Sequence, residues 1–217
     1  MSYASDERIA LCDLFDETGP DAPTLCEGWR TADLAAHLVL RERRPDAASG
    51  LMGGPLAGYA RRVNETLASR IPFPRLVELI RTGPPPVSFF KVPGVDARLN
   101  LVEFFVHHED VRRGADGWRP RELNGGLADA LWQRLSGSKL LFRRSPVGVE
   151  LARDDLTADP GERQVRMTAR ARTPVVTVTG HPAELMMWAL GRTGAAQVRI
   201  DGTADAVRQL GTARRGV

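Results

Sequence analysis

The segment from residue 96 to residue 113 constrains the fold of this chain more than any other stretch. Its apolar residues recur every three or four positions, which is the spacing of one face of an α-helix. These apolar residues are Leu99, Val102 and Val106. Three ionisable residues, Glu103, His107 and Asp110, fall on the same face. Because burial of an unpaired carboxylate is costly, a buried Glu103 requires a partner that neutralises its charge.

A further candidate ligand, His37, lies in a second helical segment. Glu103 and His107 are four residues apart, so their Cβ atoms are ~5–6 Å apart on adjacent helical turns. His37 shares the apolar face of the segment 31–44 with two leucines. Two histidines and one carboxylate from facing helices can hold a divalent metal ion and leave coordination positions open. The spacing therefore permits a metal centre formed by His37, Glu103 and His107.

The same spacing fits a second interpretation. Glu103 would then pair with an arginine, both histidines would be ordinary core residues, and the chain would be a metal-free interaction module. Asp110 could orient a ligand histidine, contact a substrate or form a surface salt bridge. His108 is rotated by ~100° from His107 and is expected to point elsewhere. His181 is expected to cap a helix rather than to bind metal.

Size, charge and cysteine content exclude several classes of protein. A chain of 217 residues can form one large domain or two modest ones. It has no apolar run of the ~18–20 residues that span a bilayer, and residues 1–8 do not resemble a signal peptide, so we expect a cytoplasmic protein. The net charge of +3 comes with scattered arginine pairs, which argues against a nucleic-acid partner. Cys12 and Cys26 do not make a disulfide framework, and at least one is expected to pack as a small hydrophobic side chain.

The periodicity changes from helical to alternating near residue 145. Before this point it predicts helices at about 9–18, 31–44, 56–67, 73–81, 96–113 and 121–142, with Thr31 as an N-cap. After Ser145 it predicts strands at 147–151, 165–169, 174–179 and 198–200, a helix at 182–190, and a last helix capped by Thr203. The sequence therefore predicts a mainly α protein, with a helical bundle at residues 1–143 and a small α+β domain at 144–217.

Three stretches of sequence resemble a known family. TLCEGWRTADLAAHL (Thr24 to Leu38) and LVEFFVHHEDV (Leu101 to Val111) resemble the mycothiol-dependent maleylpyruvate isomerase N-terminal family, part of the wider DinB-like metal-binding bundles. VTGHPAELMMWALGR (Val178 to Arg192) is similar to the start of the sterol-carrier-like C-terminal domain found in such proteins. The first two stretches are most similar to a metal-binding subgroup that need not isomerise maleylpyruvate. Glu27 stands where the family usually has proline, a departure in the loop expected to line the site.

The resemblance implies a fold, a metal and an activity. His37, Glu103 and His107 match the family's metal ligands, in a DinB-like four-helix bundle followed by a small α+β, sterol-carrier-like domain. The implied metal is zinc, with iron or nickel as alternatives, and the implied thiol cofactor is mycothiol. The expected activity is that of a thiol-dependent transferase or isomerase acting on a small electrophile, and the alternative is non-catalytic metal binding or ligand sensing. Asp110 and Arg192 are the candidate catalytic residues. For Arg192, which would neutralise an acidic substrate, the alternative is a helix-capping arginine.

Overall fold

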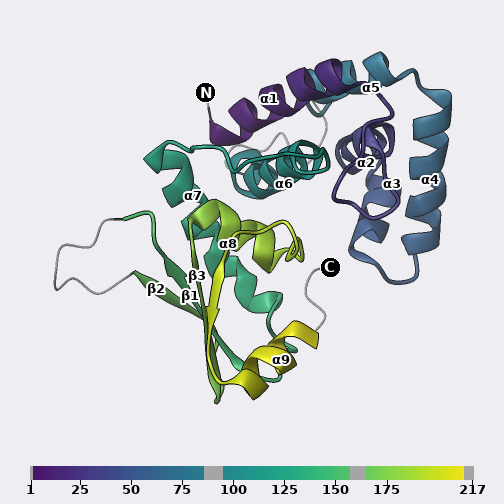
Figure 1. Cartoon of the computed structure of the whole chain (residues 1–217). Coiled ribbons are helices and arrows are strands. Elements are labelled where there is room, and N and C mark those ends of the chain that lie inside the picture. Colours follow the sequence, from purple (N-terminus) through teal and green to yellow (C-terminus); the bar gives the residue numbers. More distant parts are fainter. Residues whose placement is uncertain (1, 86–94, 157–164, 213–217) are drawn as a thin grey trace. The chain divides into compact units, whose positions relative to one another are not determined.

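The chain folds into two compact units, Met1–Arg121 and Glu122–Val217. The computed structural model describes residues 2–85, 95–156 and 165–212, without the side chains of Met52, residues 95–99 and Ser138. The first unit is helical and the second combines a small sheet with helices (Figure 1). The expected class, mainly α with a small α+β part, is therefore confirmed. The boundary between the compact units lies earlier in the chain than the expected boundary after residue 143.

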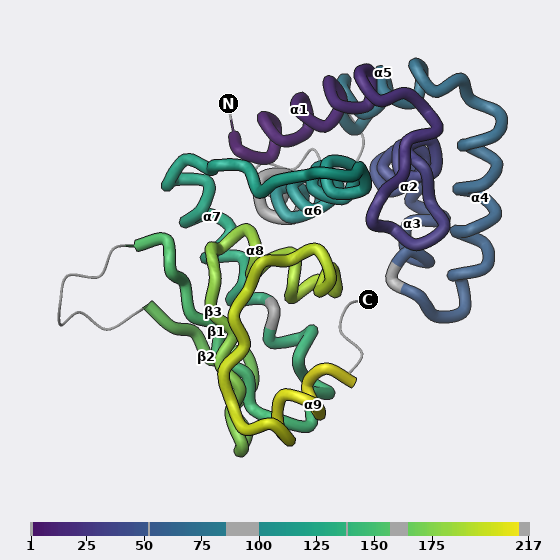
Figure 2. The backbone as a smooth tube through the Cα atoms, viewed as in Figure 1, coloured from purple at the N-terminus to yellow at the C-terminus, as the bar shows by residue number. Residues whose placement is uncertain are grey.

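The helical unit is built around two long helices that contact each other along their length. α1 packs along α6 and also contacts α5, while α2 packs against α4 and α5 (Figure 2). The elements of this unit are α1 (Tyr3–Thr18), α2 (Thr31–Arg43), α3 (Pro45–Ala48), the 3-10 turn η1 (Ser49–Met52), α4 (Ala57–Arg70), α5 (Phe73–Arg81) and α6 (Val95–Arg112). The fully buried core side chains include Leu11, Phe15, Leu34, Leu76, Ile80 and Phe104. This core holds α2 and α6, the two helices that carry the candidate ligands, in place.

The connection between α1 and α2 is fixed by its end residues. Gly19 ends α1 with a φ of 74°, a left-handed conformation that favours glycine, and its N–H donates to the Phe15 carbonyl. Thr31 was expected to be the N-cap of α2, and this expectation is wrong by one residue because Arg30 occupies the cap position. The Asp33 carboxylate accepts the Arg30 backbone N–H at 3.0 Å, while the Thr31 hydroxyl donates to the Gly19 carbonyl. The hydroxyl that could have capped the helix therefore ties α2 to the end of α1.

The second unit has a four-stranded sheet in the order β2-β1-β3-β4. β1 pairs with β3 in parallel, whereas the β1–β2 and β3–β4 pairs are antiparallel. The buried Phe142 and Trp188 rings stack with a centroid distance of 5.6 Å. The elements of this unit are α7 (Gly125–Leu135), the 3-10 turn η3 (Ser136–Leu140), β1 (Gly148–Arg153), β2 (Arg166–Arg170), β3 (Val175–Gly180), α8 (Pro182–Ala189), β4 (Arg199–Asp201) and α9 (Ala204–Thr212).

Helix α7 explains the difference in the boundary between the units. The sequence predicted a helix over residues 121–142 and grouped it with the bundle. The α-helix is shorter because the Asn124 side chain caps its start by accepting the Leu127 N–H at 2.9 Å, and residues 136–140 form the 3-10 turn. It packs against α8, so it belongs to the second unit. Across the ranges that the structure describes, no helix is both long and apolar enough to cross a membrane.

Candidate metal centre

Three ligand atoms from α2 and α6 converge in the helical unit. His37 Nε2 lies 3.2 Å from Glu103 Oε1, and His107 Nε2 lies 3.3 Å from the same oxygen. All three atoms lie within 4.8 Å of one another. A tetrahedral ion with bonds of ~2.0–2.1 Å separates its ligand atoms by about 3.3 Å. The observed spacing around Glu103 therefore fits a zinc-like ion, and the donor set of two imidazoles and one carboxylate suits it chemically.

Asp110 supports the ligand face of His107. The Asp110 carboxylate is fully buried, and its Oδ2 lies 2.9 Å from His107 Nδ1. With Nδ1–H donating to this carboxylate, the lone pair of a neutral imidazole lies on Nε2, which faces Glu103 and His37. Burial excludes the surface salt bridge considered for Asp110. The geometry agrees with the expected role of Asp110 as an acceptor that orients a ligand histidine.

The pKa values of Glu103, His107 and His37 are shifted by burial and by their contacts with one another. Burial raises the pKa of Glu103, but hydrogen bonds from His107 and His37 outweigh burial and hold that pKa well below its usual range. Burial lowers the pKa of His107, but hydrogen bonds to Asp110, Cys26 and Glu103 raise it well above the ordinary value. Burial is also the main reason that the pKa of His37 is lowered. The hydrogen bonds thus favour negative charge on Glu103 and positive charge on His107, and a divalent cation would supply positive charge at the same place.

The arginine that the alternative interpretation requires is also near. Arg41 Nε lies 3.5 Å from Glu103 Oε1, one helical turn after His37 on α2. Both histidines approach the same oxygen more closely, so the arginine is not the main partner of Glu103. His37 Nδ1 is buried and has no hydrogen-bond partner among the described residues, whereas buried core histidines are normally hydrogen-bonded. The trio is therefore not a fully satisfied core cluster, although the unpartnered nitrogen is not Nε2, the proposed ligand atom.

The site is less enclosed than the apolar stripe predicted. The Glu103 side chain retains 25% exposure, while those of His37 and His107 retain 13% and 11%. The expectation that the whole stripe faces inward is thus wrong at Glu103, and Val102 is also only half-buried. The side chain of Leu99, the first residue of the stripe, lies outside the described residues. Glu103 therefore keeps partial contact with solvent.

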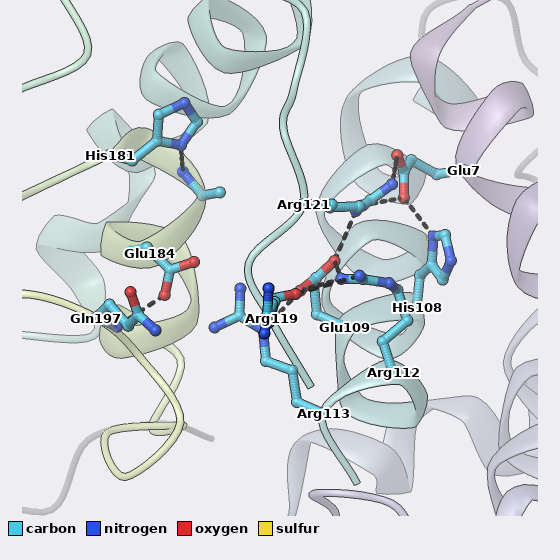
Figure 3. Close-up of polar contacts among 11 residues, drawn as sticks. Glu7, His108, Glu109, Arg112, Arg113, Arg119, Arg121, His181, Glu184 and Gln197 are labelled. Atoms are coloured by element: carbon cyan, nitrogen blue, oxygen red, sulfur yellow. Dashed lines mark hydrogen bonds and ion pairs between the residues drawn. The ribbon is translucent and has the colours of Figure 1, made fainter. Parts of the chain in front are cut away.

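The remaining histidines and Arg192 have structural contacts. His108 Nδ1 lies 3.0 Å from Glu7 Oε2 (Figure 3), so His108 has a partner outside the trio, as expected. His181 caps α8 by accepting the Ala183 N–H at 3.2 Å, also as expected (Figure 3). The Arg192 guanidinium donates to the Leu190 carbonyl at 2.8 Å, which is the capping contact considered as its alternative. Its role in substrate binding stays a prediction.

Comparison with known proteins covers the N-terminal part of the chain. Residues 3–70 match the mycothiol maleylpyruvate isomerase N-terminal domain family. The match confirms the family resemblance for the first of the three stretches, Thr24 to Leu38. His37 lies inside the matched residues, whereas Glu103 and His107 follow them. No curated protein and no solved structure gives a significant match to the chain.

Two residues in the stretch that matches the mycothiol maleylpyruvate isomerase N-terminal domain were missed as part of the site. Cys26 Sγ lies 3.3 Å from Asp110 Oδ2, and the Trp29 ring lies 5.2 Å from the His37 ring. Both come from the irregular loop before α2, where no periodicity reports which way a side chain points. Arg41 could have been found, because it follows His37 by four residues on the same helix.

Proposed function

We propose that the helical unit binds one divalent metal ion through His37, Glu103 and His107. We further propose that the protein is a metal-dependent transferase or isomerase that uses a low-molecular-weight thiol of the mycothiol type and acts on a small electrophilic molecule. The observation that carries the proposal is the convergence of three ligand atoms, in which both distances to Glu103 match tetrahedral coordination and His107 contacts a buried carboxylate. The family match of residues 3–70 supports the link to mycothiol chemistry.

The side chains of such a site would have three roles: binding the ion, orienting a ligand histidine and attracting an anionic substrate. His37 Nε2, His107 Nε2 and Glu103 Oε1 would hold the ion, for which zinc is proposed and iron or nickel are the alternatives. A bound divalent ion supplies Lewis acidity and lowers the pKa of a thiol or water that it coordinates. Asp110 would keep the imidazole of His107 in the ligand orientation by holding its Nδ1–H. Arg41 adds positive charge at the edge of the site and would favour an anionic substrate.

The relationship to larger families forms part of the same proposal. The helical unit is proposed as a DinB-like four-helix bundle, and the second unit as a sterol-carrier-like domain on the resemblance of residues 178–192. In this scheme Arg192 would neutralise an acidic substrate. The proposed partners are the thiol and the electrophile, with no nucleic acid and no membrane.

Metal content tests the ligand set. Protein purified without an affinity tag is expected to hold about one metal ion per chain, and the His37→Ala and Glu103→Gln variants are expected to hold far less. His181→Ala is the matched control, because it removes a histidine that caps α8 in the second unit. It should retain the metal of the wild-type protein. Equal metal content in the wild-type protein and in His37→Ala would contradict the proposed site.

Turnover tests the chemistry separately. Metal-loaded protein is assayed with mycothiol and other low-molecular-weight thiols against a panel of small electrophiles, including acidic ones. Activity that depends on both the thiol and the metal would support the proposal, and Asp110→Asn should reduce it. The low exposure of His37 and His107 favours a second candidate, a non-catalytic metal-binding or ligand-sensing protein. Metal binding without turnover across the panel would favour that candidate.

A further inference from the structure

His107 has polar neighbours on both of its ring nitrogens. Its Nε2 faces Glu103 and His37, whereas its Nδ1 faces Asp110. On this second side lies the thiol of Cys26, with Sγ 3.3 Å from Asp110 Oδ2. One ligand atom from each of Cys26, His107 and Asp110 lies within 4.8 Å of the other two. The helical unit thus contains two groups of potential metal ligands that share one imidazole.

The loop before α2 places the thiol at this position. The Leu25 backbone N–H donates to the Asp110 carbonyl at 3.0 Å, which ties the loop to the end of α6. The Cys26 N–H donates to the Thr24 hydroxyl oxygen at 3.2 Å. Gly114 allows the loop before α2 to lie close to the backbone that follows α6, because a Cβ atom at Gly114 would lie 2.3 Å from the Pro23 carbonyl oxygen. The position of Cys26 is therefore built into the backbone, and its half-buried side chain is not sealed in the core.

We propose that Cys26, His107 and Asp110 form a second metal site, which takes a thiophilic cation such as Cd²⁺. A thiolate is the ligand that most strongly favours soft cations over hard ones, and neither His37 nor Glu103 supplies one. On binding, the Cys26 thiol and His107 Nδ1 each release a proton to solvent and form a bond to the cation. Tetrahedral zinc bonds of ~2.3 Å to sulfur and ~2.1 Å to oxygen separate these two atoms by about 3.6 Å, and the longer bonds of the larger Cd²⁺ separate them further. The observed sulfur–oxygen distance of 3.3 Å and nitrogen–oxygen distance of 2.9 Å are shorter, so Cys26 and Asp110 must both move outward to admit the ion.

The two groups of ligands exclude each other as long as the His107 ring keeps one of its N–H protons. A neutral imidazole has one nitrogen with a free lone pair, and its other nitrogen carries the proton. When His107 uses Nδ1 for the thiophilic cation, Nε2 keeps its proton and donates it to Glu103. When His107 uses Nε2 for the proposed divalent ion, Nδ1–H donates to Asp110. This exclusion rests on the proposed function, whereas the second site itself does not depend on His37 or Glu103.

Cadmium titration of the full-length, reduced protein tests the inference. Coordination of Cd²⁺ by a thiolate gives an ultraviolet charge-transfer band that coordination by histidine and carboxylate does not give. The band is expected in the wild-type protein and in His37→Ala and Glu103→Gln, and it should disappear in Cys26→Ser. Cys12→Ser is the matched control, because Cys12 is fully buried and burial raises the pKa of its thiol to about 12. That variant should keep the band.

The outcomes separate this site from the site of the proposed function. The far-ultraviolet circular dichroism of Cys26→Ser should match that of the wild-type protein, which shows that the variant is folded. With zinc and cadmium both in excess, the wild-type protein should hold one ion per chain. A missing band in the wild-type protein, or a band that persists in Cys26→Ser, overturns the second site whatever the zinc content of His37→Ala. Loss of the band in His37→Ala, or two ions per chain, overturns the proposal of two exclusive sites.

Discussion

His107 and His108 are neighbours on α6, yet they belong to clusters of opposite character. His108 joins a network in which carboxylates and guanidinium groups are matched: Arg121 donates to both Glu7 and Glu109, and Glu109 also accepts from Arg113 (Figure 3). In the His107 cluster a single carboxylate oxygen serves two histidines, and a buried nitrogen of His37 has no partner in the part of the chain that the structure describes.

The difference between the two clusters indicates that one face of α6 mainly stabilises the fold, whereas another face offers ligand atoms. The network around Glu109 uses its polar atoms on one another, so it has little capacity left for a ligand. In the cluster around Glu103, three ligand atoms face a common point. A cation should therefore bind more favourably there than in the network around Glu109. Substitutions in the network should therefore lower the stability of the protein itself. Substitutions in the His107 cluster should mainly change what the protein gains from a metal.

Glu109→Ala is expected to have the largest effect. It removes the carboxylate that the buried Arg113 contacts at 2.6 Å, and both side chains are only 1% exposed. Breaking a buried pair from one side costs roughly 3–5 kcal/mol, because the other charge stays buried. Urea unfolding should show this loss with no metal present. Glu65→Ala is the control, since Glu65 forms an exposed pair with Arg61 at 3.9 Å and its removal should cost less than about 1 kcal/mol. Equal losses in the two variants would contradict the comparison.

The stabilisation that a bound metal provides should depend on the His107 cluster and not on surface ion pairs. Zinc at about 100 times its dissociation constant stabilises a folded protein by about 2.7 kcal/mol relative to the metal-free form. The wild-type protein and Glu65→Ala should both gain this stabilisation, and EDTA should remove it. His37→Ala should lose the gain, in addition to the loss of metal-free stability that comes from removing a mostly buried side chain. Thermal unfolding with zinc and with EDTA measures both quantities. A zinc-induced gain that survives in His37→Ala would place the ion elsewhere.

Asp110→Asn should have a smaller, selective effect. The carboxylate that orients His107 does not belong to the proposed ligand set for zinc, and loss of such an acceptor lowers metal affinity by roughly 10- to 100-fold. Competition with a chromophoric chelator measures the change. Asp116→Asn, in the exposed turn after α6, should leave the affinity unchanged. A wild-type affinity in Asp110→Asn would show that His107 does not need this acceptor.

The sequence predicted regular elements better than irregular contacts. α5 was predicted at its observed bounds, because apolar periodicity ends there between proline and glycine. The convergence of His37 with Glu103 followed from two helix faces and the family resemblance. Cys26 could not be placed in the same way, because its position depends on loop hydrogen bonds to the end of α6. The membership of α7 in the second unit depends on packing against α8, which a local pattern does not report.

Acid should weaken the network around Glu109 through Glu7. Burial raises the pKa of Glu7, but hydrogen bonds from His108 and Arg121 and the charge of Arg121 outweigh burial, so the pKa lies below 4.5. A carboxylate with a lowered pKa in the folded state contributes stability that is fully present above its unfolded pKa. This contribution is lost as pH falls from about 4.5 through the folded pKa, because the folded protein resists the proton that the unfolded chain accepts.

Glu7→Gln isolates this part of the pH dependence. The amide cannot ionise, so the variant should be less stable than the wild-type protein at pH 7, and the difference should shrink as pH falls below 4.5. Urea unfolding of metal-free protein between pH 7 and pH 3 measures the difference, and removal of the metal keeps the His107 cluster out of the comparison. Because Arg121 still contacts Glu109 in the variant, the effect should be smaller than that of Glu109→Ala. A stability difference that stays constant down to pH 3 would mean that the pKa of Glu7 is the same in the folded and unfolded states.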